Sequence, residues 1–391
     1  MKMFLKGAAV GGIASALVVA ATAALAGTGV GGIFNLGQTN TVNAKTSLKG
    51  STAKKNLQIT NTGSGSALGL KVGPGHPPMT VDSSVKVANL NADKLDGLSS
   101  KSLQRAYART VVVSPKATAE ASGNALKAAV ASITTAAADK RYMVEVEPGI
   151  YDLGNSKLTM KSFVDIEGSG VGATTITRNG GADWFDGTVA GATNTELRLL
   201  TVENTGGGTQ SVAIVAQDVN PFSVRWVEAK ASGAPDNAAI LVHGDGAHAD
   251  LYGSTFTATG GDNAYAVYYS GGCSATMTLS DATASGATAN NWGVRQNRCN
   301  ATPITNSRIT STGIGIEGDS SCGLFCIGAG PFVRIQNSVI HGATNSIHSA
   351  CCMQTRVSSS MLSGGPLSSP FTTCIYVWDE DYAAASTTAC P

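Results

Sequence analysis

The stretch "HGDGAH" is the densest group of side chains in this sequence that could perform acid–base chemistry. It places His243, Asp245 and His248 within six residues, and Asp236 lies seven residues before His243. Imidazole and carboxylate groups are the usual general acids and bases, provided that they converge on one point. The intervening glycines fit a solvated turn equally well, which is the competing interpretation. Asp236, His243 and Asp245 are the candidate catalytic residues, and no metal or cofactor site is predicted.

A second group of polar side chains recurs at a fixed distance after glycine. Gln210, Asn237 and Asn290 each stand four residues after a glycine of a repeat. Stacked amides commonly satisfy backbone groups from turn to turn, so a structural ladder is one interpretation. The other is a sugar-binding groove, whose candidate glycan-binding residues are Gln210, Asn237, Asp262, Asn263 and Tyr265.

These residues lie within a repeat of 26 or 27 residues that is marked by glycine. Six glycines follow one another at intervals of 26, 27, 27, 26 and 27 residues: Gly180, Gly206, Gly233, Gly260, Gly286 and Gly313. Apolar and polar residues alternate before each glycine, as in a strand with one buried face. The residues expected to point inward stand four before each glycine: Ile176, Val202, Ala229, Phe256, Ala282 and Ile309.

A second apolar strand follows each glycine by about seven residues, for example "VAIVA" and "YAVYY". Two or three short strands per repeat describe one coil of a parallel β-solenoid. Rows of Thr and Ser are expected on its outer surface, and Glu203 is expected to pair with Lys230 on the next coil. A flat Thr lattice of this kind could also bind ice, although charged residues interrupt it.

The segments before the repeat predict a leader, an extended region and a cap. Residues 1–26 have Lys residues, an apolar run and an A-x-A site before Gly27, which is typical of a secretory signal peptide cleaved near Ala26. Residues 27–108 are Gly- and Thr-rich and are expected to be extended. Residues 109–391 form the predicted β-helix domain, and a helix at about 122–138 is expected to cover its open end, with Ser122 or Asn124 as N-cap.

Composition excludes several classes of function. Without the leader the chain has 25 basic and 26 acidic residues, so nothing favours binding to nucleic acid or to an anionic membrane. No second apolar run is long enough to span a membrane. The low charged fraction of 14% and the 47 glycines fit a secreted or cell-surface β protein with many turns.

All eight cysteines lie between Cys273 and Cys390, which predicts disulfide bonds in an exported protein. Cys273 and Cys299 occupy equivalent positions after repeat glycines and are the preferred pair. Cys352 and Cys374 are a second candidate pair. A zinc site that uses Cys322 and Cys326 is the rival interpretation, but it lacks a second pair of ligands.

Three stretches, "EPGIYDLG", "FVDIEGSGVGATTITRNG" and "LLTVENTGGGTQSVAIVA", resemble successive segments of pectinesterases. These enzymes belong to the wider pectin-lyase-like family of right-handed parallel β-helices, and the resemblance covers roughly residues 109–235. It implies that Gln210 matches a glutamine that stabilises an oxyanion. Asp236 is the nearest match to the family's acid/base aspartate, but its flanks differ. Ile240 stands where the nucleophilic aspartate is expected, so pectinesterase activity is not predicted.

Residues 85–98 resemble a short element of tail-fibre-like and surface proteins, which favours an elongated, trimeric assembly. The sequence therefore predicts an all-β protein, a right-handed parallel β-helix with a capping helix and an extended N-terminal region. Its predicted function is binding of a polysaccharide or cell-surface glycan as a non-catalytic adhesin or surface structural protein. The alternative is a divergent carbohydrate-active enzyme, a polysaccharide lyase, esterase or hydrolase.

Overall fold

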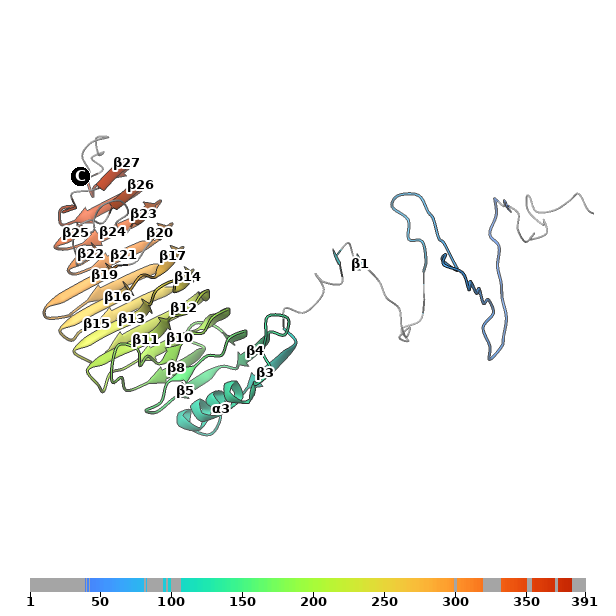
Figure 1. Cartoon of the computed structure of the whole chain (residues 1–391), viewed down its shortest axis with the longest axis horizontal. Helices are drawn as coiled ribbons and strands as arrows, with labels where there is room; N and C mark the ends of the chain where they lie inside the picture. The colour runs from blue at the N-terminus through green and yellow to red at the C-terminus, as the bar shows by residue number, and fades with distance from the viewer. Residues whose placement is uncertain are drawn as a thin grey trace, which may run out of the picture. The chain divides into compact units, whose positions relative to one another are not determined.

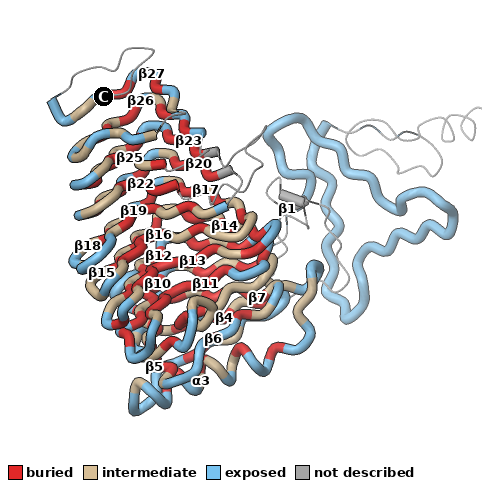
Figure 2. Tube along the Cα trace, turned by 60° about the vertical axis from the view of Figure 1, so that its left-hand side comes forward, coloured by how far each residue is buried: buried red, intermediate tan, exposed pale blue. Residues whose placement is uncertain are grey.

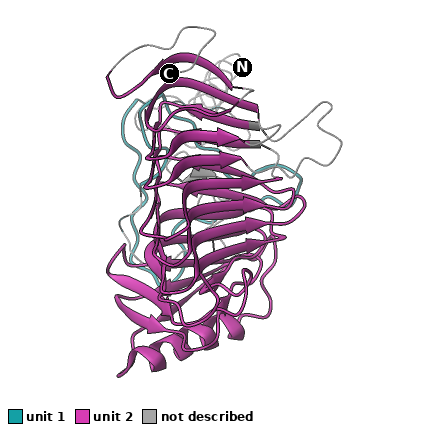
Figure 3. Ribbon diagram, turned by 90° about the vertical axis from the view of Figure 1, so that its left-hand side faces the viewer, with its two compact units in different colours: residues 1–91 teal, residues 92–391 magenta. Residues whose placement is uncertain are grey.

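The computed structural model of the protein describes residues 39, 41, 43–80, 82, 94–95, 98–99, 107–298, 301–318, 332–349, 354–369 and 372–381. The chain divides into two compact units, residues 1–91 and 92–391 (Figure 3). The predicted signal peptide, Cys299 and Cys352 lie outside the described residues.

The described residues of the first unit contain no helix or strand, and residues 43–80 are exposed throughout. Even the apolar side chains of Leu57 and Ile59 are 60% and 46% exposed. This part of the chain therefore builds no hydrophobic core of its own. The second unit opens with a short antiparallel pair, β1 (Lys94–Leu95) and β2 (Leu98–Ser99).

The rest of the second unit is a stack of parallel coils, each made of strands on three sides (Figure 1). Two sides belong to one sheet that bends at a corner, and we call it the bent sheet. Its first arm contains β3 (Arg109–Val113), β4 (Tyr142–Val146), β7 (Val164–Gly168), β14 (His248–Tyr252), β17 (Ser274–Thr278), β20 (Ala301–Thr305), β23 (Phe332–Gln336) and β27 (Thr372–Trp378). Its second arm contains β5 (Gly149–Asp152), β8 (Thr174–Arg178), β15 (Thr255–Thr259), β18 (Asp281–Ser285), β21 (Arg308–Ser311) and β24 (Val339–Gly342). Three long strands run through both arms: β10 (Thr195–Asn204), β12 (Phe222–Ser232) and β26 (Gln354–Gly364). Strand β27 follows β26 past the corner and ends at Trp378 in the second arm.

The third side of each coil lies in a separate eight-stranded sheet. Its strands are β6 (Leu158–Thr159), β9 (Val189–Ala190), β11 (Gln210–Gln217), β13 (Asp236–His243), β16 (Asn263–Ser270), β19 (Asn290–Asn297), β22 (Ile314–Gly318) and β25 (Asn345–Ser349). Neighbouring strands of this sheet pair in parallel from coil to coil. The predicted fold class, a right-handed parallel β-helix, is confirmed.

The core fills the space that the three sides enclose (Figure 2). The six residues predicted to point inward stack on one another in register, and each is fully buried. Glu203 and Lys230 are also neighbours in register. The predicted ion pair between them is not formed, because Lys230 instead contacts Glu228 of its own strand at 2.9 Å.

A ladder of buried serines stabilises the corner of the bent sheet. Each hydroxyl accepts a hydrogen bond from a backbone N–H of the preceding coil and donates to the carbonyl two residues before it. Its members are Ser254, Ser280, Ser307, Ser338 and Ser360. The ladder satisfies backbone groups that the bend removes from regular strand pairing. This structural ladder was not predicted from the sequence.

Helix α3 (Ala119–Ser132) packs on β5 and covers the N-terminal end of the coils. Leu126 and Val130 are buried against the core, and a methyl group on Gly123 would lie 1.9 Å from the Asp152 carbonyl oxygen. The helix begins earlier than predicted, because Thr118 rather than Ser122 or Asn124 is its N-cap. It ends at Ser132 rather than near residue 138, because a run of β-branched residues begins directly after it with Ile133.

No helix of the described chain is long and apolar enough to cross a membrane. Cys273 and Cys374 are both disulfide-bonded and buried in the core. The predicted partners Cys299 and Cys352 lie outside the described residues, so both pairings stay predictions.

Candidate functional site

The structure does not bring the histidines of "HGDGAH" together. His243 ends β13 in the eight-stranded sheet, and His248 begins β14 in the bent sheet. The Nδ1 atom of His243 lies 2.8 Å from the hydroxyl of Ser270, and that of His248 lies 2.8 Å from the hydroxyl of Ser274. Each ring is therefore tied to the next coil, while Asp245 is exposed in the turn between the two strands. Among the described residues no group of His, Cys, Asp and Glu is placed to hold a metal ion.

A polar row does run along the outer face of the eight-stranded sheet, at the first position of β11, β13, β16 and β19. Its members, Gln210, Asp236, Asn263 and Asn290, are consecutive partners in register. The amide of Asn290 donates to Asn263 at 2.9 Å, and the amide of Asn263 donates to Asp236 at 2.8 Å. Gln210 donates to the other oxygen of Asp236 at 3.3 Å. Both oxygens of Asp236 therefore accept amide hydrogen bonds, which suits a binding surface better than a proton-transferring acid.

This row corrects the one predicted from the sequence, which contained Asn237 in place of Asp236. Asn237 is fully buried, and its amide bonds to backbone groups of Ala234 and Gly260. Asn204 and Ala231 are partners in register, and so are Gln210 and Asp236, so the chain between these positions is one residue shorter before β13 than before β11. A shift of one residue reverses the face of a strand. Asp262 lies in the next turn, where it accepts a hydrogen bond from Thr288 at 3.2 Å.

An aromatic cluster lies beside the polar row and is centred on Tyr265 and Trp292, which stand two residues further along β16 and β19. The ring of Tyr265 stacks on Trp292 with centroids 4.6 Å apart and on Tyr268 at 5.0 Å. Trp184 packs edge-on against both tyrosines, and the guanidinium of Arg295 lies 4.4 Å from the ring centroid of Trp292. Burial raises the pKa of Tyr265 to about 12, so its phenol stays neutral at physiological pH. Tyr265 and Trp292 are nearly buried, whereas Trp184, Tyr268 and Arg295 are half-exposed.

Trp184 belongs to the loop between β8 and β9, residues 179–188, which crosses the outer face. Arg178 anchors this loop from β8: its guanidinium is only 4% exposed and donates to both carboxylate oxygens of Asp186, at 2.8 and 3.0 Å. These hydrogen bonds hold the pKa of Asp186 below its usual value. Phe185, which stands between Asp186 and Trp184 in the chain, packs against His243 with the two ring centroids 4.8 Å apart. Trp184 is therefore held in place by a buried ion pair.

The same face carries a row of charged side chains on its later coils. Arg295 of β19, Glu317 of β22 and His348 of β25 are consecutive partners in register. Glu317 is 9% exposed, and its carboxylate lies 2.9 Å from Nδ1 of His348. The 26- or 27-residue repeat does not predict this row, because its intervals are 22 and 31 residues. The matching strands "WGVR", "IGIE" and "NSIH" contain the signal that could have revealed it.

Ile240 of β13 is fully buried and pairs in register with Ile214 and Val267 in the core. It therefore points away from the outer face on which the polar row and the aromatic cluster lie. A nucleophilic group at this position could not reach a ligand bound on that face.

No protein-family model and no curated protein sequence matches the chain. Several solved structures are similar to it. A pectin methylesterase in complex with a hexasaccharide is 10% identical with a TM-score of 0.39, over 66% of this chain and 85% of that chain. Pectin methylesterase PemA from Erwinia chrysanthemi is 11% identical with a TM-score of 0.35, over 72% of this chain and 92% of that chain. The A-module of mannuronan C-5 epimerase AlgE4 from Azotobacter vinelandii is 13% identical with a TM-score of 0.30, over 66% of this chain and 91% of that chain. The fold of this chain is established by its own strand pairing, and it is the parallel β-helix that the sequence resemblance implied.

Proposed function

We propose that the protein binds a polysaccharide along the outer face of the eight-stranded sheet. The observation that carries this proposal is the polar row of Gln210, Asp236, Asn263 and Asn290 beside a cluster of aromatic rings. We call the two together the aromatic face. Its half-exposed members next to the polar row are Trp184, Tyr268 and Arg295.

The chemistry of the aromatic face suits sugar rings. A pyranose presents apolar C–H groups that pack on aromatic rings, and hydroxyl groups that exchange hydrogen bonds with amides and carboxylates. The polar row repeats once per coil, at the strand spacing of about 4.8 Å. A row that repeats in this way favours a linear polymer over a single small molecule. Since Asp236, His243 and His248 are engaged by neighbouring side chains, we favour binding without cleavage, as in an adhesin or surface structural protein.

Replacing Trp184 or Tyr268 by alanine should weaken polysaccharide binding about thirtyfold. The loss corresponds to about 2 kcal/mol, which is typical of an aromatic residue at the centre of an interface. The measurement is retention of the full chain on immobilised pectin, alginate and bacterial glycans, followed by titration against the glycan that retains it.

Trp226→Ala is the matched control. This tryptophan lies at the corner of the bent sheet and is 49% exposed, so the same change is made away from the aromatic face. Affinity should remain at the wild-type level in this variant. Equal losses in Trp226→Ala and Trp184→Ala, or no retention of the wild type on any glycan, would contradict the proposal.

The second candidate is a divergent carbohydrate-active enzyme, and the pair of Glu317 and His348 favours it. A carboxylate bonded to Nδ1 fixes the tautomer of a histidine and leaves Nε2 available as a base. If the protein cleaves a polymer, His348→Ala should abolish the shortening of the chain, and Glu317→Gln should reduce it at least tenfold. Size-exclusion chromatography of the incubated glycans provides the measurement. If shortening survives His348→Ala but disappears in Asp236→Ala, the chemistry belongs to the polar row. If it disappears in Asp245→Ala, the chemistry belongs to the turn before β14.

Export, surface location and trimeric assembly stay predictions. Export rests on the leader sequence, and trimerisation rests on the tail-fibre-like element at residues 85–98 and on the exposed apolar residues of the first unit. Light scattering of the secreted protein, compared with a chain that begins after residue 91, tests the assembly.

A further inference from the structure

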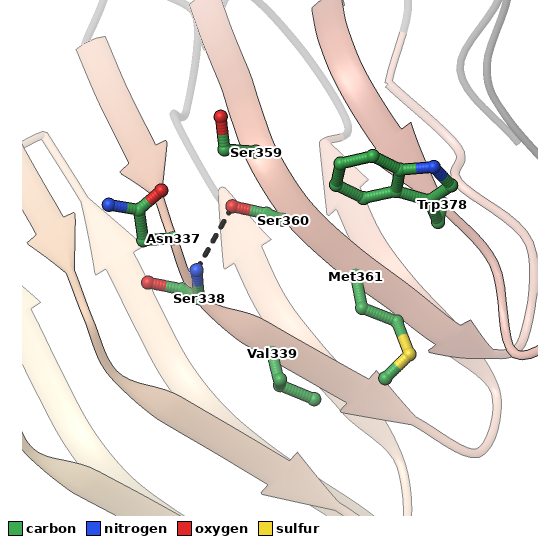
Figure 4. Close-up of a pocket in the computed structure, with 7 residues that line it drawn as sticks. All are labelled: Asn337, Ser338, Val339, Ser359, Ser360, Met361 and Trp378. Atoms are coloured by element: carbon green, nitrogen blue, oxygen red, sulfur yellow. Dashed lines mark hydrogen bonds between the residues drawn. The ribbon is translucent and has the colours of Figure 1, made fainter. Parts of the chain in front are cut away.

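The last three coils form an open pocket on the bent sheet, on a side of the coils other than the aromatic face. It has a volume of about 340 Å³ and is lined by Asn337, Ser338, Val339, Ser359, Ser360, Met361 and Trp378 (Figure 4). This volume is at the lower end of the range of about 300 to 1,000 Å³ that small-molecule sites occupy. It fits a single sugar ring.

One wall of the pocket is apolar. Val339 of β24, Met361 of β26 and Trp378 of β27 are consecutive partners in register, and all three are at least partly exposed. On the earlier coils the same outer row is polar, with Glu228, Thr255, Asp281 and Arg308. The change from charged to apolar side chains at this point creates a local surface that is suited to a partly apolar ligand.

The opposite wall is polar but uncharged. Asn337 and Ser359 stand at the corner of the bent sheet, both with left-handed backbone (φ 49° and 48°) and both exposed. The hydroxyls of Ser338 and Ser360 beneath them belong to the serine ladder, in which Ser360 accepts from the N–H of Ser338 at 3.1 Å. The amide of Asn337 and the hydroxyl of Ser359 therefore form the polar rim, while the ladder fixes the backbone that presents them.

We propose that this pocket binds one neutral pyranose residue, stacked on Trp378 with its hydroxyls towards Asn337 and Ser359. None of the seven lining residues carries an ionisable side chain, which favours a neutral sugar over a uronate or an amino sugar. An aromatic wall combined with a few fixed polar groups is the usual composition of a small-ligand site. The site goes beyond the proposed function, because it shares no residue with the aromatic face.

The test uses the full chain and the methyl glycosides of glucose, mannose and galactose as probes. Ligand-observed NMR should detect binding of at least one of them, with a Kd on the order of 1 mM. Trp378→Ala should weaken that binding at least tenfold. Trp226→Ala is the matched control, since Trp226 also lies at the corner of the bent sheet, is 49% exposed and is outside the pocket, and it should bind like the wild type.

Asn337→Gly separates binding from folding, because glycine accepts the left-handed backbone and removes only the amide. This variant should keep the wild-type melting temperature and bind the glycoside several-fold more weakly. Trp184→Ala should leave glycoside binding unchanged, so failure of the aromatic face and failure of the pocket are distinguishable. The proposal is overturned if no glycoside binds, if Trp378→Ala and Trp226→Ala behave alike, or if cyclohexanol binds as tightly as the sugar.

Discussion

Replacing Asp186 by alanine is expected to lower the free energy of unfolding by about 3 to 5 kcal/mol, because it leaves the buried guanidinium of Arg178 without its counter-charge. Arg178 is 4% exposed and makes two hydrogen bonds to this carboxylate, so water cannot replace the lost partner without rearrangement of the loop. The loop carries Trp184, and polysaccharide binding should fall together with stability. Urea unfolding and the glycan titration measure the two effects.

Lys157→Ala is the control for this prediction. Lys157 approaches the same carboxylate at 3.9 Å, but its side chain is 39% exposed, so its removal should change stability by less than about 1 kcal/mol. A loss of similar size in both variants would mean that the burial of Arg178 is not what makes the pair important.

The contribution of Asp186 should also depend on pH. Because the pKa of Asp186 is lowered in the folded protein from an ordinary value of 3.8, the stabilisation is fully present above that value. It should be lost as the pH falls through the lower, folded-state pKa. The difference in stability between the wild type and Asp186→Asn should therefore be constant from pH 5 to 7 and shrink below about pH 4. A difference that grows on acidification would contradict this assignment.

The fold could be predicted from the sequence because several independent sequence patterns specify the same coil. The glycine interval gives the length of the coil, and the alternation before each glycine gives the buried face, as Val202 and Phe256 illustrate. Stacking of equivalent residues then follows, since no single coil can bury its own apolar face. The end of α3 was placed six residues too late because the alanine-rich stretch continues beyond Ile133, while β-branched residues already favour an extended backbone there.

The candidate site was less predictable because it depends on the lengths of turns and on side-chain conformations. One residue fewer before β13 moves Asp236 into the polar row and turns Asn237 inward. Irregular intervals concealed the alignment of Arg295, Glu317 and His348. The contact of Trp184 with Tyr265 joins residues of a loop and a strand three coils apart in sequence, and no periodic pattern connects them.

Gly206→Ala is expected to lower the free energy of unfolding by about 2 to 6 kcal/mol in total, from backbone strain and from overpacking together. Gly206 has φ 97°, and a left-handed backbone costs a residue with a side chain about 1 to 3 kcal/mol. Its added methyl group would also lie 2.3 Å from the Gly233 carbonyl oxygen and 2.8 Å from the Gly233 Cα, which adds an overpacking cost of about 1 to 3 kcal/mol. Both obstructing atoms are backbone of the next coil, so the coils themselves must separate.

Gly246→Ala separates these two effects. Gly246 has φ 76°, but no atom lies within 4 Å of the position that its methyl group would occupy, so this variant measures backbone strain alone. Thermal and urea unfolding should give a loss of about 1 to 3 kcal/mol for Gly246→Ala, in line with the strain of one left-handed residue, and at least about 1 kcal/mol more for Gly206→Ala. Equal losses would mean that Gly206 is required only for its backbone conformation. A larger loss at Gly206 would mean that glycine is also required at this position for the close contact of its coil with Gly233 of the next coil.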